Sequence, residues 1–270
     1  MPELPEVEAI CRKLNEAGIV GGRVVRARFL RPAIARPQIA SEIEAAIEGR
    51  ILSRIDRRAK NLLLHFSGGF VLRVHLRMTG HLFVIPDARL MSSNTRACVE
   101  FSRHRALVFE DPRALGRIHL HTEEEMRELL APLGPEPLSA EFTPEWLRNA
   151  AALSRKPAKL FLMDQNSVAG LGNIYAAEAL FHARIDPAKP MNQLRRAKLE
   201  ALHGSIVRVL NDAVQSACKA YSSPARFSEA ESFSCFVYDR EGDSCLLCRR
   251  KVRRIRQGGR STYYCPGCQK

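Results

Sequence analysis

The sequence predicts an α+β fold: an N-terminal antiparallel β-sandwich with a flanking helix, then a helical domain and a zinc-binding β-hairpin. Three observations support this fold. Short β-like segments separated by turn residues fill residues 23–121, apolar residues at helical spacing dominate residues 144–217, and two Cys-x-x-Cys pairs follow residue 244.

The N-terminal part begins with one helix and continues as strands. Residues 6–17 place Val7, Ile10, Cys11 and Leu14 on one helical face, and Gly18 ends the helix. Alternating segments follow, joined by turns such as Ser67-Gly68-Gly69, and we expect strands at 24–30, 51–55, 62–66, 70–76, 97–101, 106–109 and 117–121. Several short strands at this spacing predict an antiparallel sandwich or barrel.

A breaker-rich segment at 133–139 marks the expected end of the β-sandwich domain, which we place at 1–133. A helical domain is expected at 134–234 and a cysteine-rich finger at 235–270. The helices of the second domain are predicted at 144–153, 159–164, 174–183 and 193–217. The second and third flank Gly170 and Gly172, whose tight connection can direct N–H groups at a phosphate as helix-turn-helix modules do. Taken alone, this glycine pair is a weak signal.

Composition indicates a polyanionic partner. The chain has 42 Lys and Arg against 29 Asp and Glu, a formal net charge of +13, so nucleic acid is the leading candidate. At 46% hydrophobic residues, 270 residues can bury a sizeable core. No apolar run approaches the ~20 residues of a membrane span and no signal-peptide core follows the N-terminus, so we expect a cytoplasmic protein. Nothing in the chain requires more than a monomer.

The C-terminal cysteines predict one structural Zn²⁺. Cys245 and Cys248 form one pair and Cys265 and Cys268 the other, with sixteen residues between the pairs. Four thiolates complete a tetrahedral site with no open position, so the ion should stabilise the fold rather than catalyse. The hairpin between the pairs is strongly basic and places Arg260 beside a Gly-Gly turn. Arg260 is therefore either a phosphate contact or a solvated surface charge.

The first residues offer an unusual nucleophile. Proline inside a chain has no N–H, but if Met1 is removed Pro2 becomes a free secondary amine with a pKa near or above the ~8 of α-amino groups. Such an amine can form an iminium with an aldehyde-level carbon, and Glu3 follows as a candidate acid or base. A retained Met1 would acylate Pro2 and abolish the nucleophile. The alternative is that Pro2 only precedes a helix, a position that proline commonly occupies.

Four motifs together resemble the formamidopyrimidine-DNA glycosylase and endonuclease VIII family. They are Met1-Pro2-Glu3-Leu4-Pro5-Glu6-Val7-Glu8, Leu76-Arg77-Met78-Thr79-Gly80, Asp164 with Gly170-Leu171-Gly172-Asn173-Ile174-Tyr175, and the four-cysteine finger. The resemblance runs along the whole chain in matching order, and the opening motif is closer to the formamidopyrimidine branch. It implies a helix-two-turn-helix domain at 134–234 and a base-excision repair enzyme for damaged double-stranded DNA. Such an enzyme removes oxidised bases, 8-oxoguanine and formamidopyrimidines, and then cuts the strand.

The resemblance also implies residue roles. Pro2 resembles the nucleophile that attacks C1′, and Glu3 resembles the acid that assists sugar-ring opening. Lys60 resembles the lysine associated with β-elimination, and Arg260 resembles the arginine associated with δ-elimination and phosphate binding. Asn173 resembles the asparagine at the DNA backbone. Arg155, Lys159 and His75 are further candidate DNA contacts, although a solvated basic face, or for His75 a place within the sheet, would explain them equally well.

The space left by an extruded base must be filled, and Met78 and Arg113 resemble two members of the family's void-filling trio. Leu115 is a departure, because the formamidopyrimidine branch typically has phenylalanine there; leucine fills volume but cannot stack on a base. Without the resemblance, Met78 and Leu115 would be assigned to the core. A second departure is the stretch 219–234, which looks shorter than the family's base-capping loop and carries Pro224, Arg226 and Phe227.

Two alternative functions remain open on the sequence. A non-catalytic, zinc-dependent DNA or RNA binder would have the same charge, finger and helical turn. An endonuclease VIII-like glycosylase would share the chemistry and excise oxidised pyrimidines instead. The N-terminal Pro-Glu favours an enzyme over the first alternative, and comparison of damaged substrates separates the second.

Overall fold

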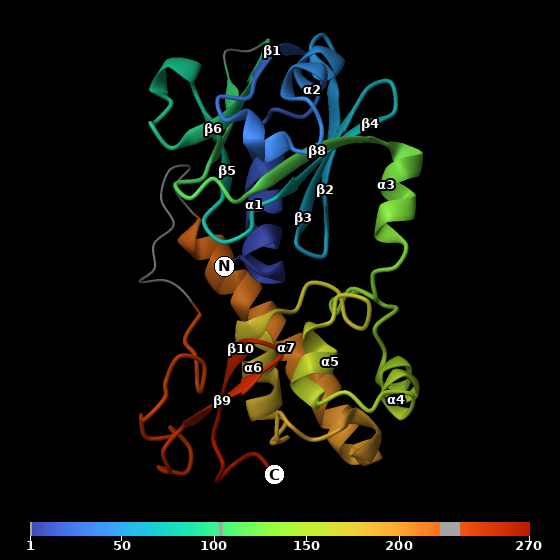
Figure 1. The fold of residues 1–270 in the computed structure, drawn as a ribbon, viewed down its shortest axis with the longest axis vertical. Coiled ribbons are helices and arrows are strands. Elements are labelled where there is room, and N and C mark those ends of the chain that lie inside the picture. Colours follow the sequence, from blue (N-terminus) through green and yellow to red (C-terminus); the bar gives the residue numbers. More distant parts are fainter. Residues whose placement is uncertain (1, 103–104, 222–232) are drawn as a thin grey trace. The chain divides into compact units, whose positions relative to one another are not determined.

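The computed structural model describes residues 2–102, 105–221 and 233–270, which form two compact units (Figure 1). Unit 1 comprises Met1–Pro132 with Val214–Glu231, and unit 2 comprises Leu133–Ala213 with Ser232–Lys270. The predicted α+β class is confirmed, with antiparallel sheets in unit 1 and helices with a two-stranded hairpin in unit 2. Of the residues 219–234 discussed above, 222–232 lie outside the described part of the chain.

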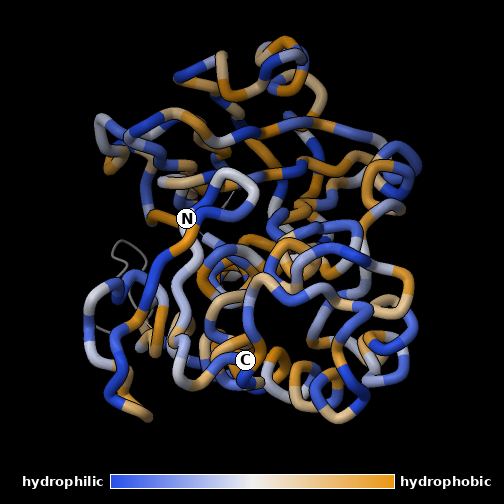
Figure 2. The backbone as a smooth tube through the Cα atoms, turned by 60° about the horizontal axis from the view of Figure 1, so that its bottom comes forward, coloured by the Kyte–Doolittle hydropathy of each residue, from blue (hydrophilic) through white to orange (hydrophobic). Residues whose placement is uncertain are grey.

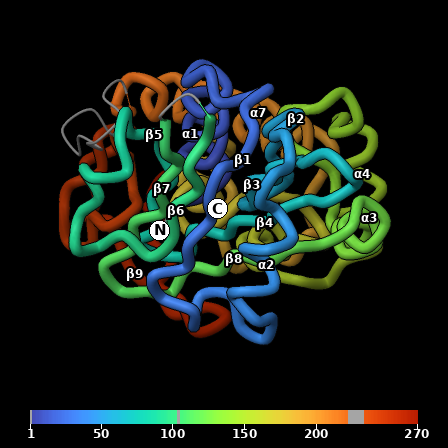
Figure 3. Tube along the Cα trace, turned by 90° about the horizontal axis from the view of Figure 1, so that it is seen from above, coloured from blue at the N-terminus to red at the C-terminus, as the bar shows by residue number. Residues whose placement is uncertain are grey.

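Unit 1 contains helix α1 (Leu4–Glu16) and two four-stranded antiparallel sheets. The first sheet has the order β1-β6-β7-β5 and the second β2-β3-β4-β8. Their strands are β1 (Val24–Arg28), β2 (Leu52–Arg58), β3 (Asn61–Phe66), β4 (Phe70–His75), β5 (His81–Ile85), β6 (Thr95–Phe101), β7 (Ala106–Glu110) and β8 (Arg117–Thr122). In Figure 3, strands β5, β6 and β7 lie on one side of this unit and strands β2, β3 and β4 on the other.

The core of unit 1 follows from the sequence periodicity. Helix α1 buries Leu4, Val7, Ile10 and Leu14 on one face, and the strands add side chains at alternate positions, such as Leu72 and Val74 of β4. Figure 2 shows the result along the backbone, where apolar and polar residues are interleaved within helices and strands alike. Burial of apolar surface stabilises such a core by roughly 25 cal/mol per Å².

The second sheet has two different faces. Its inner face belongs to the core, whereas Leu63 and Val71 on its outer face pack against Met126 of helix α3 (Glu123–Leu130). Helix α3 begins with a capping box in which Thr122 and Glu125 exchange hydrogen bonds. It covers only part of the outer face.

Three elements of unit 1 are additional to those predicted. They are α3, helix α2 (Ala40–Ile47) and strand β5. Short 3₁₀ turns at Pro32–Ala35 and Ala88–Leu90 complete the unit.

Unit 2 contains the predicted helices as α4 (Pro144–Ala152), α5 (Ala158–Met163) and α6 (Asn173–His182), followed by a 3₁₀ turn at Met191–Gln193. Helix α7 (Arg196–Ala220) begins here, and its last residues belong to unit 1. Strands β9 (Arg253–Gln257) and β10 (Arg260–Tyr264) form the predicted hairpin. In the described part of the chain, no helix combines the length and apolarity needed to cross a membrane.

Candidate active site and nucleic-acid interface

The start of helix α1 holds Pro2 and Glu3. Glu3 is the N-cap and only 1% exposed. Its side chain accepts a hydrogen bond from the Glu6 backbone N–H, while the Glu6 carboxylate accepts one from the Glu3 N–H at 2.8 Å. This capping box fixes the Glu3 carboxylate beside Pro2, at the positive end of the helix dipole.

Lys60 lies in the two-residue turn that joins β2 to β3. The preceding residue, Ala59, has φ +53°, as the first central residue of a tight hairpin turn requires. Arg57 donates one hydrogen bond to the Ala59 carbonyl at 3.0 Å and another to the Glu8 carboxylate of α1 at 2.7 Å. The Arg57 guanidinium therefore fixes the Lys60 turn against the helix that carries Glu3. Burial alone would raise the pKa of Glu8, but the hydrogen bonds and charges of Arg57 and Arg12 lower it.

His75 is the last residue of β4 and is half-buried. Its Nδ1 accepts a hydrogen bond from the Arg77 backbone N–H at 3.1 Å. Burial, with the nearby cations Arg77, Arg73 and Lys60, lowers the pKa of His75 to about 4. The ring is therefore neutral near pH 7, with its proton on Nε2.

The predicted void-filling residues lie together on two loops of unit 1. Met78 and Leu115 are 47% and 37% exposed, so they are not core residues, and the Arg113 guanidinium lies 3.7 Å from the Met78 sulfur. The buried carboxylate of Asp111 connects the two loops. It accepts hydrogen bonds from the Thr79 hydroxyl, the Gly116 N–H at 2.7 Å and the Arg113 N–H at 3.2 Å.

The burial of Lys159 in unit 2 contradicts one prediction. Lys159 was predicted as a phosphate contact, but it is fully buried. Its ammonium donates to Asn173 Oδ1 at 2.7 Å, to the Ser261 carbonyl at 3.0 Å and to Thr262 Oγ1 at 2.9 Å. An ammonium has three N–H donors, and all three are used within the protein. Lys159 thus connects α5 to α6 and to the β9–β10 hairpin.

Asn173 is the first residue of α6 and is half-buried. Because lysine can only donate, the Asn173 atom that it contacts must be the amide oxygen. The amide NH₂ is then left to donate to an anion, and the helix N-terminus adds favourable electrostatics.

The hairpin places Arg260 at the start of β10, paired with Gln257 across a two-residue turn. Gly258 and Gly259 form that turn with φ +53° and +76°, values that glycine adopts without strain. A Cβ at Gly258 would lie 2.9 Å from Leu160 Cδ2, so the hairpin tip packs directly on α5. Arg260 is exposed, and so is Arg155, which precedes α5.

The four finger cysteines form one cluster whose sulfur atoms all lie within 4.8 Å of one another. Cys245 and Cys268 are 3.9 Å apart and Cys248 and Cys265 are 3.4 Å apart. Tetrahedral Zn²⁺ with ~2.3 Å bonds places its sulfurs about 3.8 Å from one another, so the residues fit one structural Zn²⁺. Nearby Gln269 is 3% exposed and bridges the Cys265 N–H and the Ile185 carbonyl.

A buried carboxylate attaches the segment before the finger to α6. Glu178 is fully buried and accepts hydrogen bonds from the backbone N–H groups of Phe236, Val237 and Tyr238 at 2.8–3.0 Å. Burial raises the pKa of Glu178 despite these three donors. Sequence reasoning missed Glu178 and Asp111, because a carboxylate in a helix or a loop carries no sign of distant backbone partners.

Comparisons with known proteins match every part of the chain. The formamidopyrimidine-DNA glycosylase N-terminal domain matches residues 1–118, the formamidopyrimidine-DNA glycosylase H2TH domain matches 133–223, and a zinc finger found in FPG and IleRS matches 242–270. A protein of Chloroflexus aurantiacus named formamidopyrimidine-DNA glycosylase is 39% identical over 276 residues, which cover 100% of this chain and 98% of the relative. The chain belongs to the formamidopyrimidine-DNA glycosylase family.

Other members of this family are similar along the whole chain. A formamidopyrimidine-DNA glycosylase of Symbiobacterium thermophilum is 40% identical and covers 100% of this chain and 89% of its own length. The Lactococcus lactis Fpg in complex with DNA containing an abasic site has a TM-score of 0.88 at 29% identity, with both chains fully covered. A MutM structure with DNA containing carbocyclic 8-oxo-G has a TM-score of 0.89 at 30% identity.

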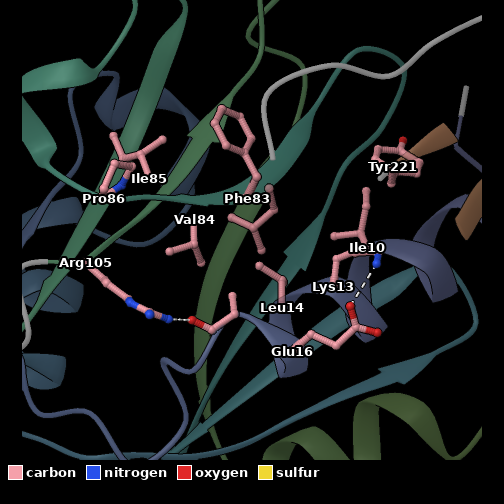
Figure 4. Close-up of a pocket in the computed structure, with 12 residues that line it drawn as sticks. Ile10, Lys13, Leu14, Glu16, Phe83, Val84, Ile85, Pro86, Arg105 and Tyr221 are labelled. Atoms are coloured by element: carbon pink, nitrogen blue, oxygen red, sulfur yellow. Dashed lines mark hydrogen bonds and ion pairs between the residues drawn. The ribbon is translucent and has the colours of Figure 1, made fainter. Parts of the chain in front are cut away.

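An apolar pocket of unit 1 is not lined by the family's expected reactive residues. It has a volume of about 410 Å³ and is lined by the second half of α1, including Ile10 and Leu14, and by Phe83 to Pro86 (Figure 4). Figure 4 shows Lys13 paired with Glu16 and the Arg105 side chain directed at the Ala17 carbonyl. Neither Pro2 nor Glu3 lines this pocket, so we do not assign it to the active site.

Proposed function

We propose that this chain is a bifunctional DNA glycosylase and abasic-site lyase that excises oxidised bases from double-stranded DNA. One observation carries the proposal: in a chain of this family, Pro2 stands directly before a buried Glu3 that is held by a capping box. The named relatives and the DNA complexes of the similar structures support it. The substrate class is 8-oxoguanine and formamidopyrimidines, because similar structures hold DNA with carbocyclic 8-oxo-G and Fapy-dG.

The first step is nucleophilic attack of the Pro2 amine on C1′ of the damaged nucleotide. The bond between C1′ and the base nitrogen breaks, and the base leaves with the electron pair of that bond and takes up a proton. The proline nitrogen loses its N–H proton, which restores its lone pair. Glu3 then supplies a proton to O4′ as the C1′–O4′ bond breaks, and the nitrogen lone pair forms the C1′=N iminium.

The iminium acidifies the C2′ proton. Its removal sends an electron pair into a C2′–C3′ double bond and expels the 3′ phosphate, which is β-elimination. Loss of a C4′ proton extends the conjugation and expels the 5′ phosphate, and water finally hydrolyses the imine and frees Pro2. Lys60 is positioned by Arg57 and Glu8 to assist the first elimination, and Arg260 on the hairpin supports the second.

DNA binding uses groups from both units. In unit 2, Asn173 and Arg260 bind backbone phosphates, with Arg155 adding charge. In unit 1, His75 donates to a phosphate through Nε2, and Met78, Arg113 and Leu115 fill the space left by the extruded base. Zn²⁺ supplies no chemistry and stabilises the finger.

Each proposed domain has its own role. We propose catalysis in a β-sandwich domain at 1–133, backbone binding in a helix-two-turn-helix domain at 134–234 and phosphate binding in a finger at 235–270. The protein acts as a monomer on cytoplasmic DNA.

The test is borohydride trapping of the Met-processed protein on a duplex with one abasic site, followed by peptide mapping. The expected adduct is on Pro2. The matched control is Pro5→Ala, because Pro5 lies within α1 and its nitrogen is a peptide nitrogen, so this variant should trap as wild type does. Binding of the duplex without any adduct would refute the enzyme and favour a non-catalytic DNA binder. Excision assays on 8-oxoguanine and on oxidised pyrimidines then separate the two branches of the family.

A further inference from the structure

The outer face of the second sheet carries a group of basic side chains beyond α3. Arg73 and His75 lie two residues apart on β4 and so share this face, because their neighbours Leu72 and Val74 belong to the core. On β8, His119 pairs with Arg73 and Arg117 pairs with His75. Arg77 follows on the loop after β4. We call Arg73, His75, Arg77, Arg117 and His119 the outer-face cluster.

Residues of the outer-face cluster lie close enough to shift one another's pKa values. Burial and then the charge of Arg77 lower the pKa of Arg73. Burial, with the charges of Arg73, Arg117 and Arg77, lowers the pKa of His119 even though its backbone hydrogen bond opposes the shift. Like charges in contact are destabilising, so the free protein holds this arrangement at a cost.

The arginines of the outer-face cluster have no carboxylate partner in the described part of the chain. Among the described residues, Arg73, Arg77 and Arg117 form no ion pair, whereas Arg54, also on this sheet, is paired with Asp56 at 2.8 Å. The Arg73 Nε is buried and has no hydrogen-bond partner in the described part of the chain. The charge of Glu125 of α3 acts on His121, which lies two residues after His119 on β8, and opposes the lowering of the His121 pKa.

His119 of β8 orients Arg73. Arg73 Nη2 donates to His119 Nδ1 at 3.1 Å, and because arginine can only donate, the His119 proton must reside on Nε2. That proton is used in a hydrogen bond of 2.8 Å to the Arg36 carbonyl. The neutral ring thus acts as a spacer that holds the guanidinium in place without adding charge to the cluster.

We propose that the outer-face cluster binds backbone phosphates of the DNA outside the damaged nucleotide, with Arg73 and Arg77 as the principal contacts. The inference rests on the proposed function and extends it, because neither Arg73 nor Arg77 is among the DNA contacts assigned there. DNA fits the cluster because the cluster starts at His75, a proposed phosphate contact, which pairs with Asn61 directly after the Lys60 turn. From there it continues along β4, where residues two apart are separated by about 6.7 Å, a spacing suited to successive groups on an extended polyanion.

The test measures how DNA affinity depends on salt. Wild type, Arg73→Gln, Arg77→Gln and Arg73→Lys are titrated by fluorescence anisotropy against an undamaged duplex and one containing a stable abasic-site analogue, over a range of KCl concentrations. The control is Arg26→Gln, because Arg26 is an exposed arginine on β1 of the other sheet. Thermal unfolding confirms that each variant is folded, and exposed Arg77 serves as the second position should Arg73→Gln be unstable.

Each neutralised phosphate contributes about 0.9 to the slope of log K against log salt, so loss of one contact should lower affinity roughly eightfold at 0.1 M salt. We expect this loss on both duplexes for Arg73→Gln and Arg77→Gln, near wild-type slopes for Arg73→Lys, and no change for Arg26→Gln. Slopes for both glutamine variants equal to that of Arg26→Gln would overturn the proposal. Wild-type protein that binds DNA but gives no borohydride adduct would instead overturn the proposed function and leave the cluster standing.

Discussion

Replacing Lys159 with methionine should loosen the β9–β10 hairpin. Methionine keeps the length and most of the volume of the lysine side chain but removes the ammonium that three acceptors share. Asn173 and Ser261 are half-buried and can recover a hydrogen bond from water, whereas Thr262 is fully buried. A buried acceptor without a partner costs about 1–3 kcal/mol, and each rehydrated one about 0.5–1.5 kcal/mol. We therefore expect a loss of about 2–6 kcal/mol in the free energy of unfolding of unit 2.

The Lys159→Met protein should also bind DNA more weakly than wild type. Without Lys159 the Asn173 amide is no longer held with its NH₂ available, and losing one such hydrogen bond weakens binding roughly tenfold. Urea unfolding followed by circular dichroism gives the stability, and fluorescence anisotropy on an abasic-analogue duplex gives the affinity.

The control is Lys156→Met. Lys156 lies three residues earlier, is exposed and pairs with Asp164 at 2.5 Å, so it should contribute less than about 1 kcal/mol. A Lys159→Met protein with wild-type stability and a salt slope reduced by about 0.9 would refute the structural role, because that is the signature of a direct phosphate contact.

Four further outcomes are expected. Asp111→Asn should lose an acceptor for at least one of three hydrogen bonds. We expect the free energy of unfolding to fall by about 1–3 kcal/mol and incision of damaged DNA to slow. Unchanged values of both would contradict the role of Asp111 in joining the two loops. The lowered pKa of His75 means that the folded state resists protonation, so a stabilising contribution of up to about 3 kcal/mol is complete above pH 6.5 and disappears as the pH falls towards 4. In urea titrations at pH 5 and pH 7, the free energy of unfolding of His75→Gln should not show this pH dependence. If wild type and His75→Gln lost the same stability between pH 7 and pH 5, the assignment to His75 would be wrong. Cys245→Ala should abolish stoichiometric zinc, measured by atomic absorption, and weaken DNA binding. Arg260→Gln should lower the salt slope by about 0.9, whereas an identical slope would show that Arg260 is a solvated surface charge.

Local pattern was sufficient for most of the secondary structure. The short apolar runs of β3 and β4, the helical spacing in α6 and the Gly-Gly turn before Arg260 are decided by neighbouring residues, and each was predicted close to its observed bounds. Strand β5 was missed because its short apolar run is ambiguous without its partner β7. Helix α3 was missed although Thr122 and Glu125 carry the capping-box signal.

Long-range partners could not be read from the sequence. Lys159 stands in a basic segment, which suggested a solvent-facing charge, and only the fold brings Thr262 to it from more than a hundred positions away. The same is true of Asp111, whose partner Thr79 lies on another loop, and of Arg73 and His119, which become neighbours through the β4–β8 register. Sequence motifs were sufficient to predict candidate reactive groups, whereas the residues that position these groups depend on tertiary pairing.

The buried side chain of Gln269 has a practical consequence for handling this protein. Because Gln269 is hydrogen-bonded to Cys265 and Ile185, an affinity tag fused after Lys270 begins one residue beyond a packed anchor beside the zinc ligands. A flexible spacer of several Gly and Ser residues would separate such a handle from the finger. A handle at the other end would convert the proposed Pro2 nucleophile into an amide, so a purification scheme that tests the proposed activity should use a spaced C-terminal tag.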